Sequence, residues 1–178
     1  AITAETLTLK SIAEYKEPRI NMTAINQCGY QAFASNMSPL PYKLFNSLTT
    51  PSADSWNSFQ SSYNTSTGSH SAAANLGTDY PSGGTTVDGE YVAITLPDKR
   101  KLLGYKLTKV DGSTDDGSPK EFKLYARENS TSAWVLLNSE TLTTGIGEYV
   151  SGDVNTGGTR FPSAGDLTPT TAYQTYAL

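Results

Sequence analysis

Short runs in which hydrophobic and polar residues alternate are the main pattern along the second half of the chain. In residues 121–127, the hydrophobic positions Phe122, Leu124 and Ala126 alternate with more polar side chains. Alternation with a period of two predicts a strand that is buried on one face. Residues 38–46 are predicted to form a turn that leads into a single helical turn. Further strands are predicted at residues 29–35, 91–96, 102–110, 134–137 and 172–178.

Two of these predicted strands carry more specific expectations. The strand at residues 91–96 is expected to end at Pro97. The strand at residues 102–110 is expected to place Leu103, Tyr105 and Leu107 on one face. Polar segments rich in Ser, Gly, Asn and Thr separate the strands.

The longest of these polar segments, residues 59–88, exceeds the usual length of a connecting loop, which indicates a functional loop. A second long loop is predicted at residues 145–165. Short strands between turn-rich segments, without a helical period, predict an all-β fold, namely a jelly-roll β-sandwich of about eight strands with long loops.

The chain of 178 residues is long enough for one domain with a hydrophobic core. Residues 1–25 are predicted to form an N-terminal extension, and residues 26–178 the β-sandwich. Trp56, Phe122 and Trp134 are expected in the core, because each ring can bury roughly 150–250 Å². Truncating one of them to Ala should cost roughly 3–5 kcal/mol.

Composition and charge narrow the range of partners. Hydrophobic residues make up 37% and charged residues 17% of the chain, and the formal net charge is −4. Nucleic acid is therefore not an expected partner, because phosphate backbones require a basic surface and the longest basic run is only residues 99–101. The longest apolar stretches run about five residues, against the roughly twenty needed to span a bilayer. No membrane span is predicted.

The residues that could carry catalysis or bind metal are few. The chain has one histidine, His70, and one cysteine, Cys28, which cannot complete a zinc site. His70 lies in a Ser-rich loop without a nucleophile motif, so no catalytic residue is assigned. Cys28 is expected to be a small buried thiol. The acidic run 111–117 departs from a calcium loop, because Asp116 stands where that loop requires Gly.

Ligand binding is the chemistry that the loops favour instead. Sugar recognition uses aromatic faces together with polar groups held in place on loops. The long loops carry five such candidates, and a glycan or a surface protein is the partner that they indicate. The predicted ligand-binding residues are Tyr63, His70, Tyr80, Arg160 and Phe161.

Several motifs occur in an order that resembles a known family. They are the segments at 42–46 (YKLFN), 54–58 (DSWNS), 89–97 (GEYVAITLP), 103–107 (LGYKL), 118–126 (SPKEFKLYA), 134–137 (WVLL) and 172–176 (AYQTY). In this order they resemble the discoidin family, also called coagulation factor 5/8 type C, within the galactose-binding-like fold. The resemblance spans roughly residues 29–178. It implies an eight-stranded jelly roll whose loops at one end bind glycans, lipid head groups or proteins.

Two departures from the family pattern affect what the resemblance implies. Asn46 stands where many members have an Asp that helps to bind a structural calcium, so no cofactor is predicted. The family's last strand would lie beyond Leu178, which leaves the 172–178 strand as a predicted sheet edge. Such an edge tends to pair with something. Residues 1–25, a neighbouring subunit or a continuation of the chain would have to cover it.

Two functions from different classes follow from these observations. The first is a non-catalytic, surface-displayed module that recognises carbohydrate or a cell-surface ligand. The second is a structural subunit of a virion or other extracellular assembly, which would contact its neighbours through residues 1–25 and the 172–178 edge. Either role implies a location outside the cell or on a virion surface. An enzymatic role would require a catalytic region outside this chain. Four Asn-x-Ser/Thr motifs, at Asn21, Asn36, Asn64 and Asn129, are compatible with such a location but are common in a chain rich in these residues.

Overall fold

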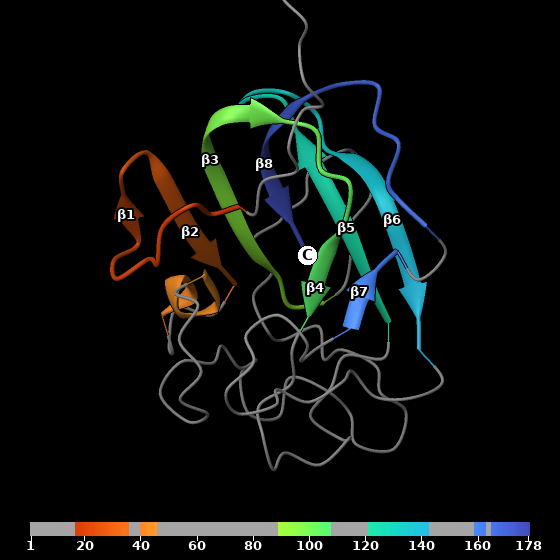
Figure 1. The fold of residues 1–178 in the computed structure, drawn as a ribbon, viewed down its shortest axis with the longest axis horizontal. Coiled ribbons are helices and arrows are strands. Elements are labelled where there is room, and N and C mark those ends of the chain that lie inside the picture. Colours follow the sequence, from red (N-terminus) through yellow and green to blue (C-terminus); the bar gives the residue numbers. More distant parts are fainter. Residues whose placement is uncertain (1–16, 36–39, 46–88, 108–120, 143–158, 163–164) are drawn as a thin grey trace, which may run out of the picture.

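The computed structural model describes residues 17–35, 40–45, 89–107, 121–142, 159–162 and 165–178. These residues form strands and one short 3-10 helix, and the all-β prediction is therefore confirmed. Figure 1 shows the strands side by side around a common interior. The jelly-roll topology stays a prediction, because the described strands do not define the full set of connections.

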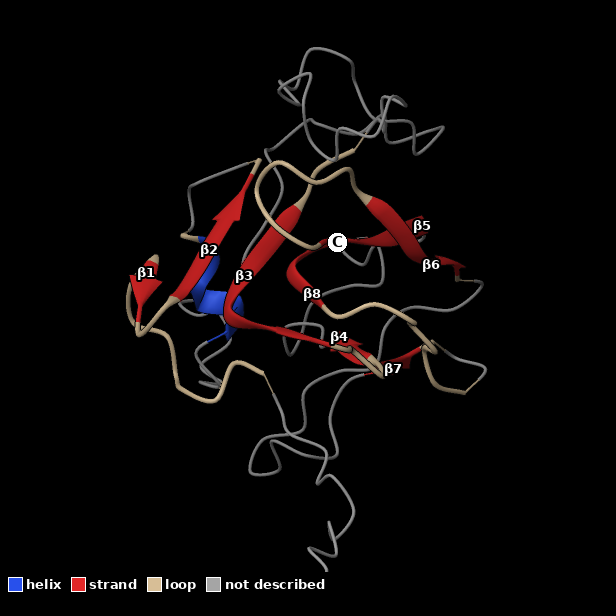
Figure 2. Cartoon of the chain, turned by 90° about the horizontal axis from the view of Figure 1, so that it is seen from above, coloured by secondary structure: helices blue, strands red, loops and turns tan. Residues whose placement is uncertain are grey.

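The strands form two sheets. The larger sheet has six strands in the order β1-β2-β3-β8-β5-β6, and the smaller sheet is the pair β4-β7. In Figure 2 the β4-β7 pair lies on one side of the larger sheet. The elements are β1 (Asn26–Gln27), β2 (Tyr30–Ala34), η1 (Pro41–Phe45), β3 (Val92–Arg100), β4 (Tyr105–Leu107), β5 (Glu121–Arg127), β6 (Val135–Thr141), β7 (Thr159–Phe161) and β8 (Tyr173–Ala177).

The predicted alternation is visible in the burial of the strands. On β5, Phe122, Leu124 and Ala126 are buried, while the flanking Glu121 and the intervening Lys123 are exposed. Neighbouring strands continue this inner face, because residues directly opposite one another in an antiparallel pair point to the same side. The expected strand at residues 29–35 and the expected helical turn are also confirmed as β2 and η1.

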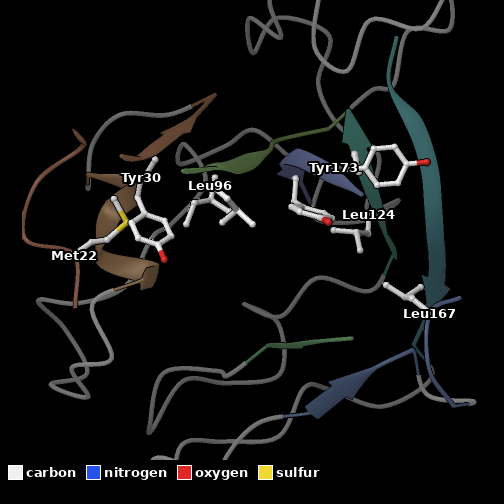
Figure 3. Packing of buried hydrophobic residues seen from close by; sticks show 10 residues of the cluster. Met22, Tyr30, Leu96, Leu124, Leu167 and Tyr173 are labelled. Carbon is white, nitrogen blue, oxygen red and sulfur yellow. The ribbon is translucent and has the colours of Figure 1, made fainter. Parts of the chain in front are cut away.

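The core lies between the two sheets and extends to the N-terminal part of the described chain. Figure 3 shows Met22 beside Tyr30, with Leu96, Leu124 and Tyr173 further along the same cluster. The prediction that Phe122 and Trp134 are buried is confirmed, since each is only 8% exposed. Trp56 lies outside the described residues.

A second, smaller cluster lies on the other face of the six-stranded sheet. It contains Trp134 with Ala93 and Ala177, and Tyr125 packs against it. The guanidinium carbon of Arg127 lies 4.6 Å from the centroid of the Trp134 ring, within range of a cation–π interaction. The sheet therefore buries residues on both of its faces near β8.

The position of β8 corrects the prediction of an exposed edge at residues 172–178. β8 lies in the interior of the six-stranded sheet, where it pairs antiparallel with β3 on one side and with β5 on the other (Figure 1). Tyr173, Thr175, Tyr176 and Ala177 are all buried. The hydroxyl groups of Thr95 and Thr175 are hydrogen-bonded at 3.1 Å.

Residues 17–25 were expected to belong to an N-terminal extension, but they pack into the domain. Met22 is fully buried, and its backbone N–H donates to the carbonyl of Phe45 at 3.2 Å. Glu17 accepts a hydrogen bond of 2.6 Å from the hydroxyl of Tyr30, and its other carboxylate oxygen lies 3.5 Å from Nε of Arg100. The core therefore begins earlier in the chain than the predicted boundary at residue 26.

The expected end of a strand at Pro97 is wrong, because β3 continues to Arg100. The register between β3 and β8 shifts between Thr95 and Arg100, and Pro97 lies within this irregular stretch with an exposed side chain. A bulge leaves residues out of the hydrogen-bonding ladder, so a proline without an N–H is tolerated there.

The strand expected at residues 102–110 is shorter than predicted where the structure describes it. Only Tyr105–Leu107 form β4, and Leu103 is exposed instead of sharing a buried face with Tyr105. The backbone carbonyl of Leu103 accepts a 2.8 Å hydrogen bond from the N–H of Leu167. Leu103 therefore lies in the segment that connects β3 to β4 and is not part of the hydrogen-bonded pair of strands β4-β7. Residues 108–110 lie outside the described part of the chain.

Cys28 is exposed, which corrects the expectation of a buried thiol. It is the first residue of a two-residue turn between β1 and β2, with φ values of 50° at Cys28 and 83° at Gly29. Two successive residues with positive φ are the requirement of the type I′ hairpin turn. The side chain at the tip of such a turn points away from the sheet, so the backbone conformation places the thiol in solvent.

Candidate functional site

Two of the five predicted ligand-binding residues lie on a described strand. Arg160 and Phe161 are both on β7. The side chain of Arg160 is exposed and that of Phe161 is buried, because neighbouring residues in a strand point to opposite faces. Tyr63, His70 and Tyr80 lie outside the described residues. β7 is therefore the described strand that carries the candidate site.

Phe161 was expected to contact ligand from a loop, but its side chain is fully buried. Its ring lies 4.8 Å from the ring of Phe122 in an edge-to-face arrangement, and 5.6 Å from the ring of Tyr105. Edge-to-face aromatic contacts stabilise a core beyond the area they bury. Phe161 therefore links the β4-β7 pair to β5 and is a core residue, which corrects its assignment as a ligand contact.

Arg160 lies on the exposed face of β7 and is held in one orientation. Its Nη1 donates a 3.0 Å hydrogen bond to the backbone carbonyl of Gly165, and Nη2 forms an ion pair with the carboxylate of Asp166. The side chains of Arg160 and Asp166 are 52% and 54% exposed. An exposed ion pair contributes little to stability, but these two contacts fix the plane of the guanidinium while leaving it accessible.

Gly104 allows this guanidinium to lie close to the backbone. A Cβ atom at position 104 would lie 2.9 Å from Nη2 of Arg160 and 2.9 Å from the carbonyl oxygen of Phe161. A side chain at this position would displace Arg160 or separate β4 from β7. Glycine is therefore the residue that this close approach requires.

Lys106 is the direct cross-strand neighbour of Arg160 in the β4-β7 pair. Both side chains are exposed. We name the group formed by Arg160, Lys106, Asp166 and the backbone of Gly104 the Arg160 site. It combines charged hydrogen-bond donors with one carboxylate on the open face of a two-stranded ribbon.

A polar network lies on the buried side of this ribbon. Asn138 on β6 donates to the hydroxyl of Tyr105 and to a carboxylate oxygen of Glu140, each at 3.0 Å. Burial raises the pKa of Tyr105 to about 12, and the hydrogen bond from Asn138 opposes part of that effect. Tyr105 is therefore a neutral hydroxyl that positions the ribbon against β6, since its ring also packs on Phe161.

The described residues also bear on metal binding and on membrane insertion. No group of three or more His, Cys, Asp or Glu side chains within these ranges is arranged to hold a metal ion. Asn46 and the whole acidic run 111–117 lie outside the ranges. Within the same part of the chain, no helix has the length and apolar character needed to cross a bilayer.

The sequence identified Arg160 but not the residues that hold it. Gly104 becomes a neighbour of Arg160 through the β4-β7 register, and Asp166, six residues along the chain from Arg160, lies beside the Leu167 whose N–H donates to the carbonyl of Leu103. The sequence did not mark Lys106 as a ligand-binding candidate, because a single lysine in a strand is common on any solvated face. The pairing of two distant strands, which no local pattern encodes, brings the group together.

Comparison with known proteins adds no family assignment. A scan against protein-family models and a search of curated proteins each gave no match for this chain.

Proposed function

We propose that this protein is a non-catalytic binding module of the discoidin-like type that recognises carbohydrate or another ligand on a surface outside the cell. The single observation that supports this most is the Arg160 site. There an accessible guanidinium is fixed by Asp166 and by the carbonyl of Gly165. The proposal assigns no catalytic residue.

The physical case is one of preorganisation. Recognition sites for small ligands use a few polar groups held in fixed positions. A side chain that is already ordered loses less conformational entropy when it binds, so more of the interaction energy appears as affinity. At the Arg160 site the strand, the ion pair and the close approach at Gly104 all restrict the guanidinium before a ligand arrives. Tyr63 and Tyr80, the tyrosines that the sequence predicts as sugar contacts, lie outside the described residues.

A glycan array probed with the full chain tests this proposal. Saturable binding is expected, and Arg160→Ala should weaken it roughly ten- to hundred-fold, since a hydrogen bond to a charged group contributes about 1.5–3 kcal/mol. Tyr80→Ala should also weaken it. Lys99→Ala is the matched control, because Lys99 forms an exposed ion pair with Glu128 away from the site. An array without binding, or binding that Arg160→Ala leaves intact, would refute the proposal.

The second candidate function, a structural subunit of a virion or other extracellular assembly, is favoured by β6. This strand is last in the order of the six-stranded sheet, and its Val135 and Leu136 are 42% and 50% exposed. Exposed hydrophobic residues on an end strand promote pairing with another chain. Light scattering over a concentration series should show an oligomer that Leu136→Ser weakens and Lys123→Ser leaves unchanged. A monomer at all concentrations excludes self-assembly through β6.

A further inference from the structure

The Arg160 site places two cationic side chains next to one another. Lys106 and Arg160 are directly opposite in an antiparallel pair, so their Cβ atoms are about 4.5–5.5 Å apart on one face of the ribbon. Like charges at directly opposite positions destabilise a pair of strands. Asp166 already offsets part of this repulsion at Arg160, and a further negative group bound between the two side chains would offset more of it.

The hydrogen-bonding chemistry of the two side chains points the same way. Arg and Lys carry donors and no acceptor. Arg160 uses one donor toward Gly165 and one toward Asp166, which leaves further N–H groups of its five on the guanidinium plane. A neutral sugar hydroxyl is both donor and acceptor, whereas a carboxylate or a sulfate offers acceptors alone. The planar fork of arginine matches such oxyanions with two parallel hydrogen bonds.

We propose that the ligand of the Arg160 site is an acidic glycan, bound through a carboxylate or sulfate oxyanion that lies between Arg160 and Lys106. This inference rests on the function proposed above and specifies its ligand class. Asp166 has two opposing effects in this arrangement. It holds the guanidinium in place, and its negative charge competes with the incoming oxyanion.

Binding measurements with three oligosaccharides of matched length test the inference: a polyuronate, a sulfated glycan and a neutral glycan. The uronate and sulfate arms distinguish the two sources of the oxyanion. We expect the full chain to bind at least one acidic glycan at least tenfold more tightly than the neutral one. Raising the ionic strength should weaken that binding, because salt screens exposed charges.

Variants of the site separate charge from structure. Lys106→Ala and Arg160→Ala should each weaken acidic-glycan binding about tenfold or more. Arg160→Lys should give an intermediate loss, because the charge remains and the fork is lost. Asp166→Asn keeps an oxygen acceptor for Arg160 and removes the competing charge, so it should strengthen acidic-glycan binding. Circular dichroism spectra that match the parent chain would confirm that each variant is folded.

The outcomes distinguish this inference from the proposed function. Equal binding of neutral and acidic glycans, or weaker acidic-glycan binding in Asp166→Asn, overturns the oxyanion assignment and leaves a glycan-binding module in place. Acidic-glycan binding that survives Arg160→Ala places the ligand elsewhere and also overturns the inference. Absence of binding to all three glycans and to the array overturns both.

Discussion

Replacing Phe161 by Ala should destabilise the domain strongly, although Phe161 neighbours the exposed Arg160 on a three-residue strand. The Phe161 side chain is fully buried. Its ring contacts Phe122 at 4.8 Å and Tyr105 at 5.6 Å between ring centroids. It therefore connects the smaller sheet to the larger one.

The size of the effect follows from the buried ring. Removing a fully buried Phe costs about 3–5 kcal/mol, which combines the lost transfer free energy with the cavity that remains. The two aromatic contacts, at about 0.5–1.5 kcal/mol each, place Phe161 toward the upper end of that range. For a chain of this size each kcal/mol lowers Tm by about 2–4 °C, so the expected decrease is roughly 6–20 °C.

Chemical denaturation and thermal unfolding of the variant measure this directly. Phe161→Leu is the matched control, because it retains most of the volume and loses only the ring contacts, and it should cost less than Phe161→Ala. Arg160→Ala, one residue away on the exposed face, should change stability by less than 1 kcal/mol. If Phe161→Ala unfolds like the parent chain and only ligand binding is lost, the ring is a ligand contact and the packing argument is wrong.

Three further predictions concern other parts of the domain. Met22→Ala should lower the unfolding free energy by about 2–5 kcal/mol in urea, because Met22 is fully buried; an unchanged value would mean that residues 17–25 are a detachable extension. Cys28 should react with a thiol reagent in the native protein as fast as in the unfolded chain, and protection without denaturant would contradict its place at the exposed turn. Burial raises the pKa values of Tyr105 and Tyr176 from 10.0 to about 12, so the unfolded chain loses these protons first. This contribution to stability should be complete below pH 10 and should decrease between pH 10 and 12, as followed by phenolate absorbance and by unfolding; two tyrosines that both titrate near pH 10 in the folded protein would contradict it.

The sequence predicted the elements in which one face is buried and the other is solvated. β5 is the clearest case, because Phe122, Leu124 and Ala126 alternate with polar neighbours and the structure buries those three. The strand expected at residues 172–178 is likewise present, as β8. Its place in the interior of the sheet could not be predicted, because that place depends on pairing with residues of β3 and β5 about fifty to eighty positions away.

The candidate site was predicted only in part for a related reason. Residue type favoured both Arg160 and Phe161, but which face of β7 is buried depends on the register with β4. A shift of one residue would exchange the two side chains between core and solvent. Cys28 was misplaced because the preference of thiols for burial is weaker than the backbone requirement of a two-residue turn.

The central place of β8 also affects how the domain can assemble. In the described part of the chain β3 and β5 have no direct pairing, and only residues 173–177 join the two halves of the sheet. Without this strand, the described strands of a nascent chain form only the pieces β1-β2-β3, β5-β6 and β4-β7, and two- or three-stranded pieces of this kind are marginal on their own. The facing edges of β3 and β5 then have unsatisfied backbone groups, and such edges are where chains aggregate. Folding of this sheet should therefore be completed only when β8 is inserted between β3 and β5.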